Sequence, residues 1–296
     1  MNIAATQGLP GPAWAELPEV QLLAEWPPPE PLPGLDVLVA VVARVTAEEL
    51  DLLPDVRLVA NYGVGYDTVD VAACRERGIA VTNTPGVLDA AVADLTLALI
   101  LACRRHLVAS DRFVRERRWQ RGWAQPELLC RDLAGSTLGL VGRGRIGSGV
   151  ARRAEAFGMG VVHHSRSGGL PLDELLRTSD VVSLHVPLTA ETKGLISAER
   201  LRLLQDGATL INTARGAIVD EEALVDELVS GRISAGLDVF AVEPSVPERL
   251  LDLPNVVLTP HIASATVETR EGMTRVLVDN VLAFLHGEQL PNEVFS

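Results

Sequence analysis

The sequence is poor in aromatic residues and in cysteine, and each shortage narrows the kind of protein it encodes. Aromatic residues make up only 4% of the 296 residues, so the core must be built mainly from Ala, Val and Leu. Such a core suits buried parallel strands covered by helices. The three cysteines, Cys74, Cys103 and Cys130, form no CxxC or Cys/His cluster. Because zinc sites and disulfide frameworks need such clusters, we expect reduced thiols and no metal.

The chain also has fewer basic than acidic residues, which gives it a net charge of −13. Nucleic acid and anionic membrane surfaces both attract basic proteins, so neither partner is expected. The longest apolar run, 95–103, is too short to cross a bilayer. The first residues lack the basic and apolar regions of a signal peptide. We therefore expect a soluble, cytoplasmic protein.

Strand-like and helix-like segments alternate along the chain, which indicates an α/β fold. Strands are expected at 37–42, 57–61, 79–82, 137–141, 160–164, 181–184, 209–212, 235–239 and 256–258. Helical patterns lie between them, a long one covers 91–105, a charged one covers 110–118, and a closing one covers 267–285. The proline-rich segment 27–33 is expected to be an extended connection. Since 296 residues is long for one core, two domains are expected.

A glycine fingerprint restarts the alternation in the middle of the chain. Gly142, Gly144 and Gly147 form a GxGxxG pattern directly after one expected strand and before a helix. In that context the first glycine permits a tight turn, the second lets the backbone approach a pyrophosphate, and the third lets the helix pack on the strand. The helix N-terminus then offers free N–H groups to the phosphates. The pattern predicts a dinucleotide site, which includes the intervening Arg143, Arg145 and Ile146.

The end of the next expected strand favours NADP(H) over NAD(H). An NAD site has an Asp or Glu there that accepts from the ribose 2′-OH. This chain has Ser165, Arg166 and Ser167 instead. A guanidinium and two hydroxyls would bind a 2′-phosphate, which a carboxylate would repel. The alternative is that Arg166 points to solvent, so NAD(H) remains possible.

Three charged residues follow expected strands in the second half of the chain: Arg215, Glu243 and His261. Because ligands bind at the carboxyl ends of the strands in an open α/β sheet, these side chains can converge. Arg can clamp a carboxylate, and His beside a carboxylate can donate a proton near neutral pH. Taken singly, they are equally explained as a surface ion pair, a solvated loop residue and a buried histidine. Together, behind the fingerprint, they predict hydride transfer to a 2-keto acid.

Many motifs in one order resemble the D-isomer-specific 2-hydroxyacid dehydrogenase family, over about 39–292. Besides the fingerprint, the matching segments are 63–67, 82–85, 184–189, 212–216, 237–240, 243–244 and 260–261. The resemblance implies an α/β fold of two Rossmann-like or flavodoxin-like domains with parallel sheets. It implies a substrate domain of 1–93 and 268–296, with an NAD(P)-binding Rossmann domain of 94–267 inserted in it. It also implies a homodimer joined mainly through the NAD(P)-binding domains.

The same resemblance implies roles for individual residues. Arg215 would bind the substrate, His261 would act as acid and base, and Glu243 would be its partner. The backbone of Val64 and Gly65 would hold the substrate carboxylate, as a glycine-rich nest of N–H groups does. Further residues implied in cofactor binding are Pro187, Thr192, Thr213, Ala214, Asp238 and Ser264, of which Asp238 would contact the nicotinamide carboxamide.

Within the family, the chain most resembles glyoxylate/hydroxypyruvate reductases. The residues that support this are Trp119, Trp123, 128–130, 164–166, 264–266 and 269–270. A Trp near the mouth of the cleft would limit the substrate side chain, and it serves equally well as a dimer-interface or core anchor. We therefore expect NAD(P)H-dependent reduction of a small 2-keto acid to the D-2-hydroxy acid.

Two features depart from the family pattern. Arg143 stands where the family usually has an apolar residue, and it would be a second cation for a 2′-phosphate. The region before Leu35 is short and proline-rich, which leaves the outer wall of the substrate domain undefined.

Other functions remain open at this point. One is a dehydrogenase of the same family for a bulkier keto acid or a phosphoglycerate-type substrate. The other is a non-catalytic corepressor that senses NAD(H), since a fold alone does not fix a function. The intact Arg215, Glu243 and His261 argue against the second.

Overall fold

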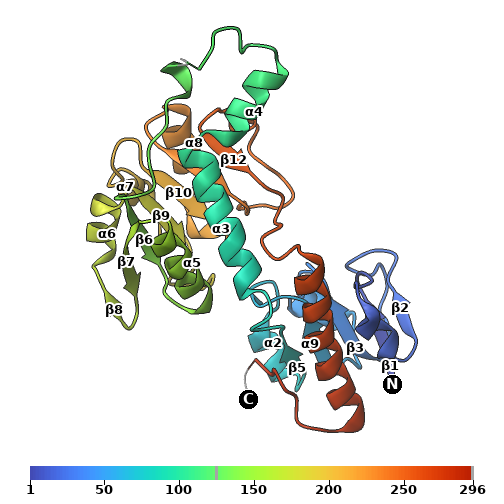
Figure 1. Cartoon of the computed structure of the whole chain (residues 1–296). Coiled ribbons are helices and arrows are strands. Elements are labelled where there is room, and N and C mark those ends of the chain that lie inside the picture. The colour runs from blue at the N-terminus through green and yellow to red at the C-terminus, as the bar shows by residue number, and fades with distance from the viewer. Residues whose placement is uncertain (124–125, 295–296) are drawn as a thin grey trace. The chain divides into compact units, whose positions relative to one another are not determined.

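The computed structural model describes residues 1–123 and 126–294, and they form two compact units (Figure 1). Unit 1 comprises Met1–Leu88 and Ser264–Ser296, and unit 2 comprises Asp89–Ala263. Within the described residues, no helix is both long and apolar enough to cross a membrane. The domain boundaries expected after residues 93 and 267 would cut into two helices, whereas the compact units divide just before them.

Unit 1 is built on a parallel sheet with strand order β2-β1-β3-β4-β5. This is the order of flavodoxin-like folds, in which the chain winds outward in both directions from a central strand. The strands are β1 (Asn2–Ala5), β2 (Val20–Leu22), β3 (Leu35–Ala40), β4 (Leu58–Asn61) and β5 (Ala80–Thr82). The helical segments are η1 (Pro12–Glu16), α1 (Ala47–Asp51), α2 (Val71–Glu76) and α9 (Val267–His286).

Helix α9 brings the end of the chain into unit 1. It starts after Thr266, whose hydroxyl accepts from the Thr269 N–H, and it ends at Gly287, whose φ of 71° is left-handed. The Tyr62 hydroxyl donates to the Arg270 carbonyl at 2.8 Å, and the chain beyond the helix returns to β5. These contacts explain why the two ends of the sequence share one unit.

Unit 2 is built on a seven-stranded sheet with strand order β12-β11-β10-β9-β6-β7-β8. The strands are β6 (Thr137–Val141), β7 (Gly160–Ser165), β8 (Gly168–Gly169), β9 (Val181–Leu184), β10 (Thr209–Asn212), β11 (Ser234–Leu237) and β12 (Val256–Leu258). The strand order reverses between β6 and β9, which is where doubly wound sheets bind ligands. The expected α/β class with parallel sheets is confirmed, with one departure: β8 runs antiparallel to β7.

Helices pack on the sheet of unit 2 and bury its central strands. They are α3 (Asp89–Arg104), α4 (Leu107–Arg115), α5 (Arg145–Ala156), α6 (Leu172–Thr178), α7 (Ala198–Leu201) and α8 (Glu221–Val229), with 3-10 turns η2 (Pro126–Leu128), η3 (Gly216–Ile218) and η4 (Glu248–Leu250). All residues of β9 and β10 are buried, as expected for strands covered on both faces. A Cβ on Gly139 would lie 2.3 Å from the Ser179 hydroxyl, so glycine lets the end of α6 pack on β6.

Two details of the sequence-based expectation differ from the structure. Strands β1 and β2 were not expected, and they supply the outer wall of unit 1 that the sequence left undefined. The helix expected at 110–118 begins at Leu107 and ends at Arg115, because His106 and Arg117 both adopt left-handed φ values that interrupt helices. We call residues 107–132, which follow the left-handed residue His106, the arm.

Candidate active site

The glycine fingerprint joins β6 to α5, as the sequence predicts. Gly142 has a φ of 99°, and a Cβ there would lie 2.5 Å from the His185 carbonyl oxygen. A Cβ on Gly147 would lie 2.3 Å from the Gly142 oxygen, so this position also needs glycine. A Cβ on Gly144 would meet no atom within 4 Å, so the chain is open to a ligand there. Gly144 is the N-cap of α5 and has no side chain to satisfy the first N–H groups of the helix.

The other fingerprint residues lie around this turn. Ile146 packs against the hydrophobic core between α5 and the sheet. Arg145 pairs with Asp89 at 3.1 Å within unit 2. Arg143 extends toward the next strand, where its guanidinium lies 3.2 Å from Nδ1 of His163.

The segment after β7 forms a tight turn that exposes Arg166. Ser165 lies at the end of the strand, and its hydroxyl donates to the Gly168 carbonyl at 3.0 Å and lies 3.1 Å from the Ser167 hydroxyl. Arg166 itself is exposed. A hydrogen bond from Thr189 lowers the pKa of the Glu191 carboxyl, and the charge of Arg166 contributes to the same shift. Arg143 and Arg166 therefore place two cations around the turn where a carboxylate would favour NAD.

His261 and Glu243 form a close pair. Nδ1 of His261 lies 2.7 Å from Oε2 of Glu243, and the Phe240 N–H donates to the other carboxylate oxygen at 3.2 Å. Burial raises the pKa of the Glu243 carboxyl, but the hydrogen bond and charge of His261, the Phe240 N–H and the field of Arg215 outweigh it. The net result is a pKa below the ordinary value, so Glu243 is ionised at neutral pH.

Arg215 lies in the loop after β10, next to the loop that carries Glu243. Asn212 holds the Arg215 segment, because its amide donates to the Arg215 carbonyl at 2.8 Å and accepts from the Ala214 N–H at 3.0 Å. A Cβ on Gly216 would lie 1.9 Å from the Phe240 carbonyl carbon, so only glycine allows the two loops to meet. The structure thus brings the predicted trio together within unit 2.

Several residues implied in cofactor binding follow strands of the same sheet. The Thr192 hydroxyl donates to the Pro187 carbonyl at 2.6 Å and closes the loop after β9. The Thr213 hydroxyl lies 3.1 Å from that of Thr96 on α3, so this helix also shapes the site. The buried carboxylate of Asp238 accepts hydrogen bonds from the loop around His261.

The remaining expected residues belong to unit 1. The carbonyls of Val64 and Gly65 accept from the side-chain amides of Asn83 and Asn61, at 2.9 and 3.0 Å. These bonds fix the loop and direct its carbonyls toward the asparagines. Ser264 lies at the start of the closing segment of unit 1.

Sequence reasoning gave no individual role to three residues near these loops: Thr96, Asn212 and His185. Asn212 carries a signal, because a polar residue that ends a buried strand needs a local partner. His185 follows β9, its ring lies 2.9 Å from the Ser183 hydroxyl, and burial lowers its pKa to about 4. It is therefore neutral at physiological pH. Thr96 gives no signal, since its hydroxyl is one polar group within an apolar helix.

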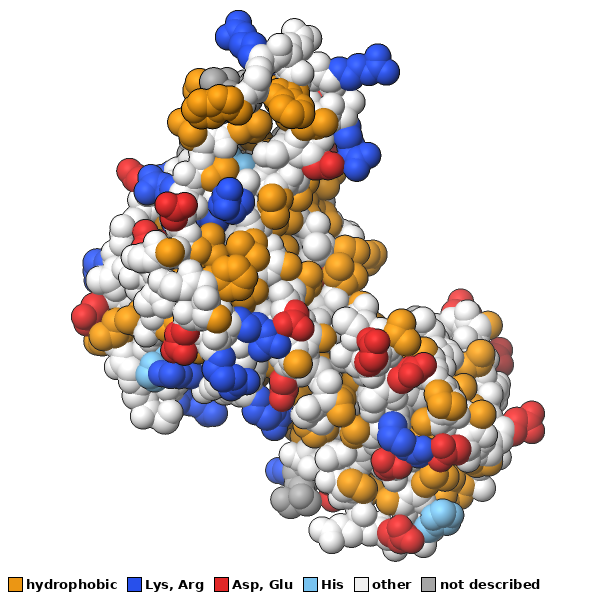
Figure 2. Space-filling view, viewed as in Figure 1, with side chains coloured by type: hydrophobic (Ala, Val, Ile, Leu, Met, Phe, Trp, Pro, Cys, Tyr) orange, Lys and Arg blue, Asp and Glu red, His pale blue; other side chains and the backbone are white. Residues whose placement is uncertain are grey.

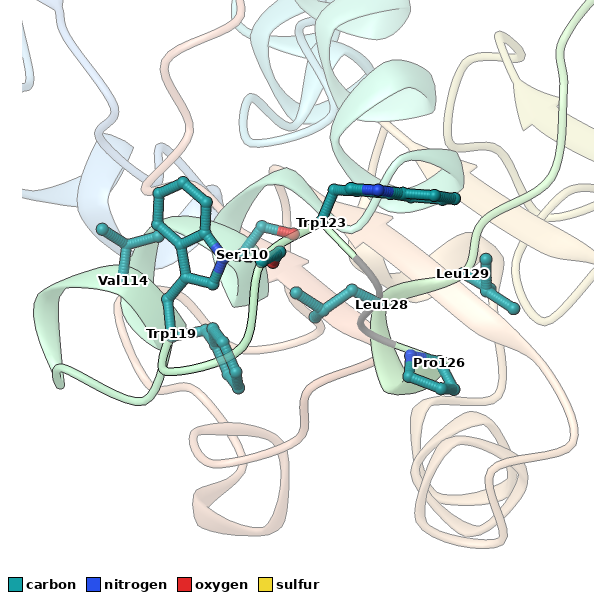
Figure 3. Close-up of a pocket in the computed structure, with 9 residues that line it drawn as sticks. Ser110, Val114, Trp119, Trp123, Pro126, Leu128 and Leu129 are labelled. Atoms are coloured by element: carbon teal, nitrogen blue, oxygen red, sulfur yellow. Dashed lines mark hydrogen bonds between the residues drawn. The ribbon is translucent and has the colours of Figure 1, made fainter.

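The arm carries a hollow of about 500 Å³, lined by apolar residues (Figure 3). Trp119 and Trp123 border it, with Leu128 and Leu129 from the returning chain. Trp123 is 94% exposed, and hydrophobic side chains gather over this part of unit 2 in Figure 2. None of the predicted trio lines the hollow, so it is a separate feature of the unit.

Comparison with known proteins gives consistent results. The family model for the NAD-binding domain of D-isomer specific 2-hydroxyacid dehydrogenases matches residues 97–263. A glyoxylate reductase of Thermococcus litoralis is 47% identical over 276 residues, which cover 88% of this chain and 83% of that protein. A glyoxylate reductase of Korarchaeum cryptofilum is also 47% identical, over 273 residues that cover 88% of this chain and 82% of that protein.

Solved structures of similar proteins contain both kinds of nicotinamide cofactor. The NADPH-dependent glyoxylate/hydroxypyruvate reductase of Sinorhizobium meliloti, in complex with NADP and malonate, is 38% identical, with a TM-score of 0.91 and coverage of 99% of this chain and 96% of that one. The D-lactate dehydrogenase of Aquifex aeolicus, complexed with NAD and lactic acid, is 32% identical, with a TM-score of 0.87 and coverage of 100% and 99%. With its fingerprint and its pair of His261 and Glu243 beside Arg215, the chain belongs to the D-isomer specific 2-hydroxyacid dehydrogenase family and is an NAD(P)-dependent oxidoreductase.

Proposed function

We propose that this enzyme reduces small 2-keto acids of the glyoxylate and hydroxypyruvate type to D-2-hydroxy acids, with NADPH as the preferred reductant. The observation that carries the proposal is the 2.7 Å contact between His261 and Glu243 in a loop cluster that also holds Arg215. The names of the similar glyoxylate reductases support the substrate class. The ionised Glu243 holds Nδ1 of His261, which leaves Nε2 for the proton donation that the reduction requires.

Each member of the trio has a distinct task in this scheme. Arg215 binds the substrate carboxylate in a charge-assisted pair and orients the keto group. With Nδ1 of His261 bonded to Glu243, Nε2 is the nitrogen that donates a proton to the carbonyl oxygen as the oxygen gains charge. Glu243 holds the ring through Nδ1 and fixes its orientation. A reduced nicotinamide held in unit 2 would supply the hydride for the carbonyl carbon, which with the proton from His261 makes up the two-electron reduction.

The cofactor fits the residues that the structure offers. A Cβ on Gly142 or Gly147 would clash with backbone oxygens, so glycine is what allows the tight turn. Gly144 leaves the N-terminus of α5 open, and its N–H groups can receive a pyrophosphate. We assign the intervening Arg143, Arg145 and Ile146 to the same site. We also assign Pro187, Thr192, Thr213, Ala214, Asp238 and Ser264 to the cofactor. Unit 2 is then the NAD(P)-binding domain and unit 1 the substrate domain, whose Val64 and Gly65 backbone receives the substrate carboxylate.

The preference for NADPH rests on the turn after β7. Ser165, Ser167 and Arg166 offer two hydroxyls and a guanidinium, and Arg143 adds a second cation nearby. A 2′-phosphate would bind these groups with charge-assisted hydrogen bonds. The ribose hydroxyl of NADH would find no carboxylate at the end of the strand.

We also propose that the protein forms a homodimer through the arm. Trp119, Trp123 and Leu129 are exposed together, and contiguous apolar patches on a surface mark interaction sites. The hollow that they border offers a place for side chains of a second copy. Sedimentation velocity should give a dimer for the wild type and a monomer for Trp123→Asp with Leu129→Asp. Phe157→Asp, which changes an exposed apolar residue outside the arm, should stay dimeric. A monomeric wild type at micromolar concentration would refute the proposal.

The reaction itself is tested by the identity of its product. Hydroxypyruvate and NADPH are incubated with the enzyme, and glycerate is resolved by chiral chromatography. The proposal predicts D-glycerate in a one-to-one ratio with the NADPH consumed. L-glycerate would refute the stereochemical assignment, and NADPH binding without any glycerate would refute the reaction.

A further inference from the structure

The loop that carries His261 is attached to one buried carboxylate. Asp238 directly follows β11, and Thr259 directly follows the neighbouring strand β12. Oδ1 of Asp238 accepts from the Thr259 hydroxyl at 2.6 Å and from the Ile262 N–H at 2.9 Å. Oδ2 accepts from the Ala263 N–H at 2.9 Å. The Asp238 carbonyl also accepts from the His261 N–H at 2.9 Å. Asp238 therefore binds the loop at His261 and at residues before and after it.

These contacts take up most of what the carboxylate can accept. A carboxylate has about four acceptor positions, and the loop occupies three of them. Asp238 is fully buried, and a buried charge persists only when hydrogen bonds replace its lost hydration. The remaining position on Oδ2 suffices for one donor of the nicotinamide. Most of the hydrogen-bonding capacity of Asp238 therefore goes to the loop and not to the cofactor.

The loop needs such an attachment because its backbone is strained at the catalytic residue. His261 has a φ of 54°, in the left-handed region that non-glycine residues rarely adopt. Strained conformations at functional sites persist only when the surrounding structure holds them. Glu243 contacts His261 at the ring, which is the end of the side chain far from the strained backbone. The Asp238 carboxylate holds the backbone of the loop, and the Thr259 hydroxyl in turn donates to that carboxylate.

We infer that Thr259 and Asp238 form a clamp that positions His261 for proton donation. The inference rests on the proposed reaction and adds to it a positioning residue, Thr259, that touches neither the substrate nor the reacting atoms. If Thr259 loses its hydroxyl, one of the three hydrogen bonds to the carboxylate is lost, and the ring leaves the geometry required for proton transfer. A misplacement of about 1 Å can cost on the order of a hundredfold in rate, so a partial release should lower kcat by about tenfold.

The test compares Thr259→Val, which removes the hydroxyl at nearly constant shape, with Thr259→Ser, which retains it. Thr209→Val is the matched control, because Thr209 is also buried and hydrogen-bonded but lies at the opposite end of β10. We expect Thr259→Val to lower kcat about tenfold, with the KM for hydroxypyruvate and the Kd for NADPH within about twofold of the wild type. Thr259→Ser should restore most of kcat, and Thr209→Val should keep it. Thr259→Ala provides the same deletion if the valine variant does not fold.

Amide hydrogen exchange of residues 259–263 supplies a second measurement that needs no turnover. The clamp predicts faster exchange of Ile262 and Ala263 in Thr259→Val, and not in Thr209→Val. Wild-type kcat in Thr259→Val would overturn the inference, as would unchanged exchange of the loop. A loss confined to NADPH affinity would also overturn it, because the pair would then serve the cofactor. Since exchange does not depend on the substrate, failure of the clamp and failure of the proposed reaction are distinguishable.

Discussion

The two units differ sharply in charge. Unit 1 carries 17 acidic and 6 basic residues, a net charge of −11, whereas unit 2 carries 22 acidic and 20 basic residues, a net charge of −2. The acidity of the whole chain is therefore mostly a property of unit 1. Unit 2 has the residues that we assign to phosphate and carboxylate binding, such as Arg143, Arg166 and Arg215. A negative net charge is therefore weak evidence against anionic ligands, because binding depends on how the charged residues are arranged at the site.

The units also differ in the chemistry that they offer. In unit 2, side chains carry the proposed reaction, and the loops that hold them are fixed by buried polar groups. In unit 1, the proposed contribution is the backbone of residues 63–65, held by Asn61 and Asn83. Substitutions in unit 2 should therefore affect catalysis in ways that substitutions in unit 1 do not.

Replacement of His261 by alanine should have the largest effect. Loss of the proton donor should lower kcat by about two to four orders of magnitude. The affinity for NADPH, measured by nucleotide fluorescence, should be nearly unchanged, because the ring is not assigned to the cofactor. An exposed histidine in unit 1, His286, serves as the control. Full activity in His261→Ala would remove this residue from the mechanism.

Replacement of Arg215 by lysine should have the next largest effect. Lysine keeps the charge but loses the planar fork that pairs with a carboxylate at two points. We expect kcat/KM for hydroxypyruvate to fall by about ten- to a hundredfold, the range expected for a charge-assisted hydrogen bond. Steady-state kinetics on Arg215→Lys and on Arg177→Lys, an exposed control in the same unit, measure it. Equal losses in both variants would contradict the assignment of Arg215 to the substrate carboxylate.

Replacement of Arg166 should change the choice of cofactor and leave the chemistry intact. Without the guanidinium, kcat/KM for NADPH should fall by about tenfold, the value of one charge-assisted hydrogen bond. The value for NADH should stay within about twofold, because NADH has no 2′-phosphate for Arg166 to bind. A parallel fall with both cofactors would instead indicate a general weakening of the site.

Replacement of Glu243 by glutamine should change the pH dependence of stability by a small amount. The pKa of Glu243 is depressed in the folded protein, so its ionised form stabilises the fold above the pKa of an unfolded glutamate, about 4.5. That contribution disappears as the pH falls through the depressed value. Wild type and variant should therefore differ in free energy of unfolding at pH 7 and converge in acid. Because the side chain is partly exposed, the difference should be below about 1 kcal/mol.

The sequence allowed most of unit 2 to be predicted, because its strands are short, apolar and separated by clear turn signals. The expected strands at 137–141, 181–184, 209–212 and 256–258 agree with β6, β9, β10 and β12. Strands β1 and β2 were missed because β1 has only one residue of high β-propensity, Ile3, and no residue of β2 is fully buried. They exist through pairing with distant residues, such as Ile3 with Val37.

The same contrast applies to the site. The trio could be predicted because each member follows a strand and has a side chain with recognisable chemistry. The clamp could not, because the partners of Asp238 are mostly backbone N–H groups more than twenty residues away, which no residue type marks. Arg145 shows a related limit, since its membership of the fingerprint does not reveal its pairing with Asp89.

The most direct test of the account measures kcat/KM with NADPH and with NADH against glyoxylate, hydroxypyruvate, pyruvate and phenylpyruvate. Absorbance of the reduced nicotinamide follows each reaction. The account predicts the highest values for glyoxylate and hydroxypyruvate with NADPH. Faster reduction of phenylpyruvate would contradict the substrate class, and tight NADPH binding without turnover of any acid would contradict the claim that the trio of unit 2 performs the reduction.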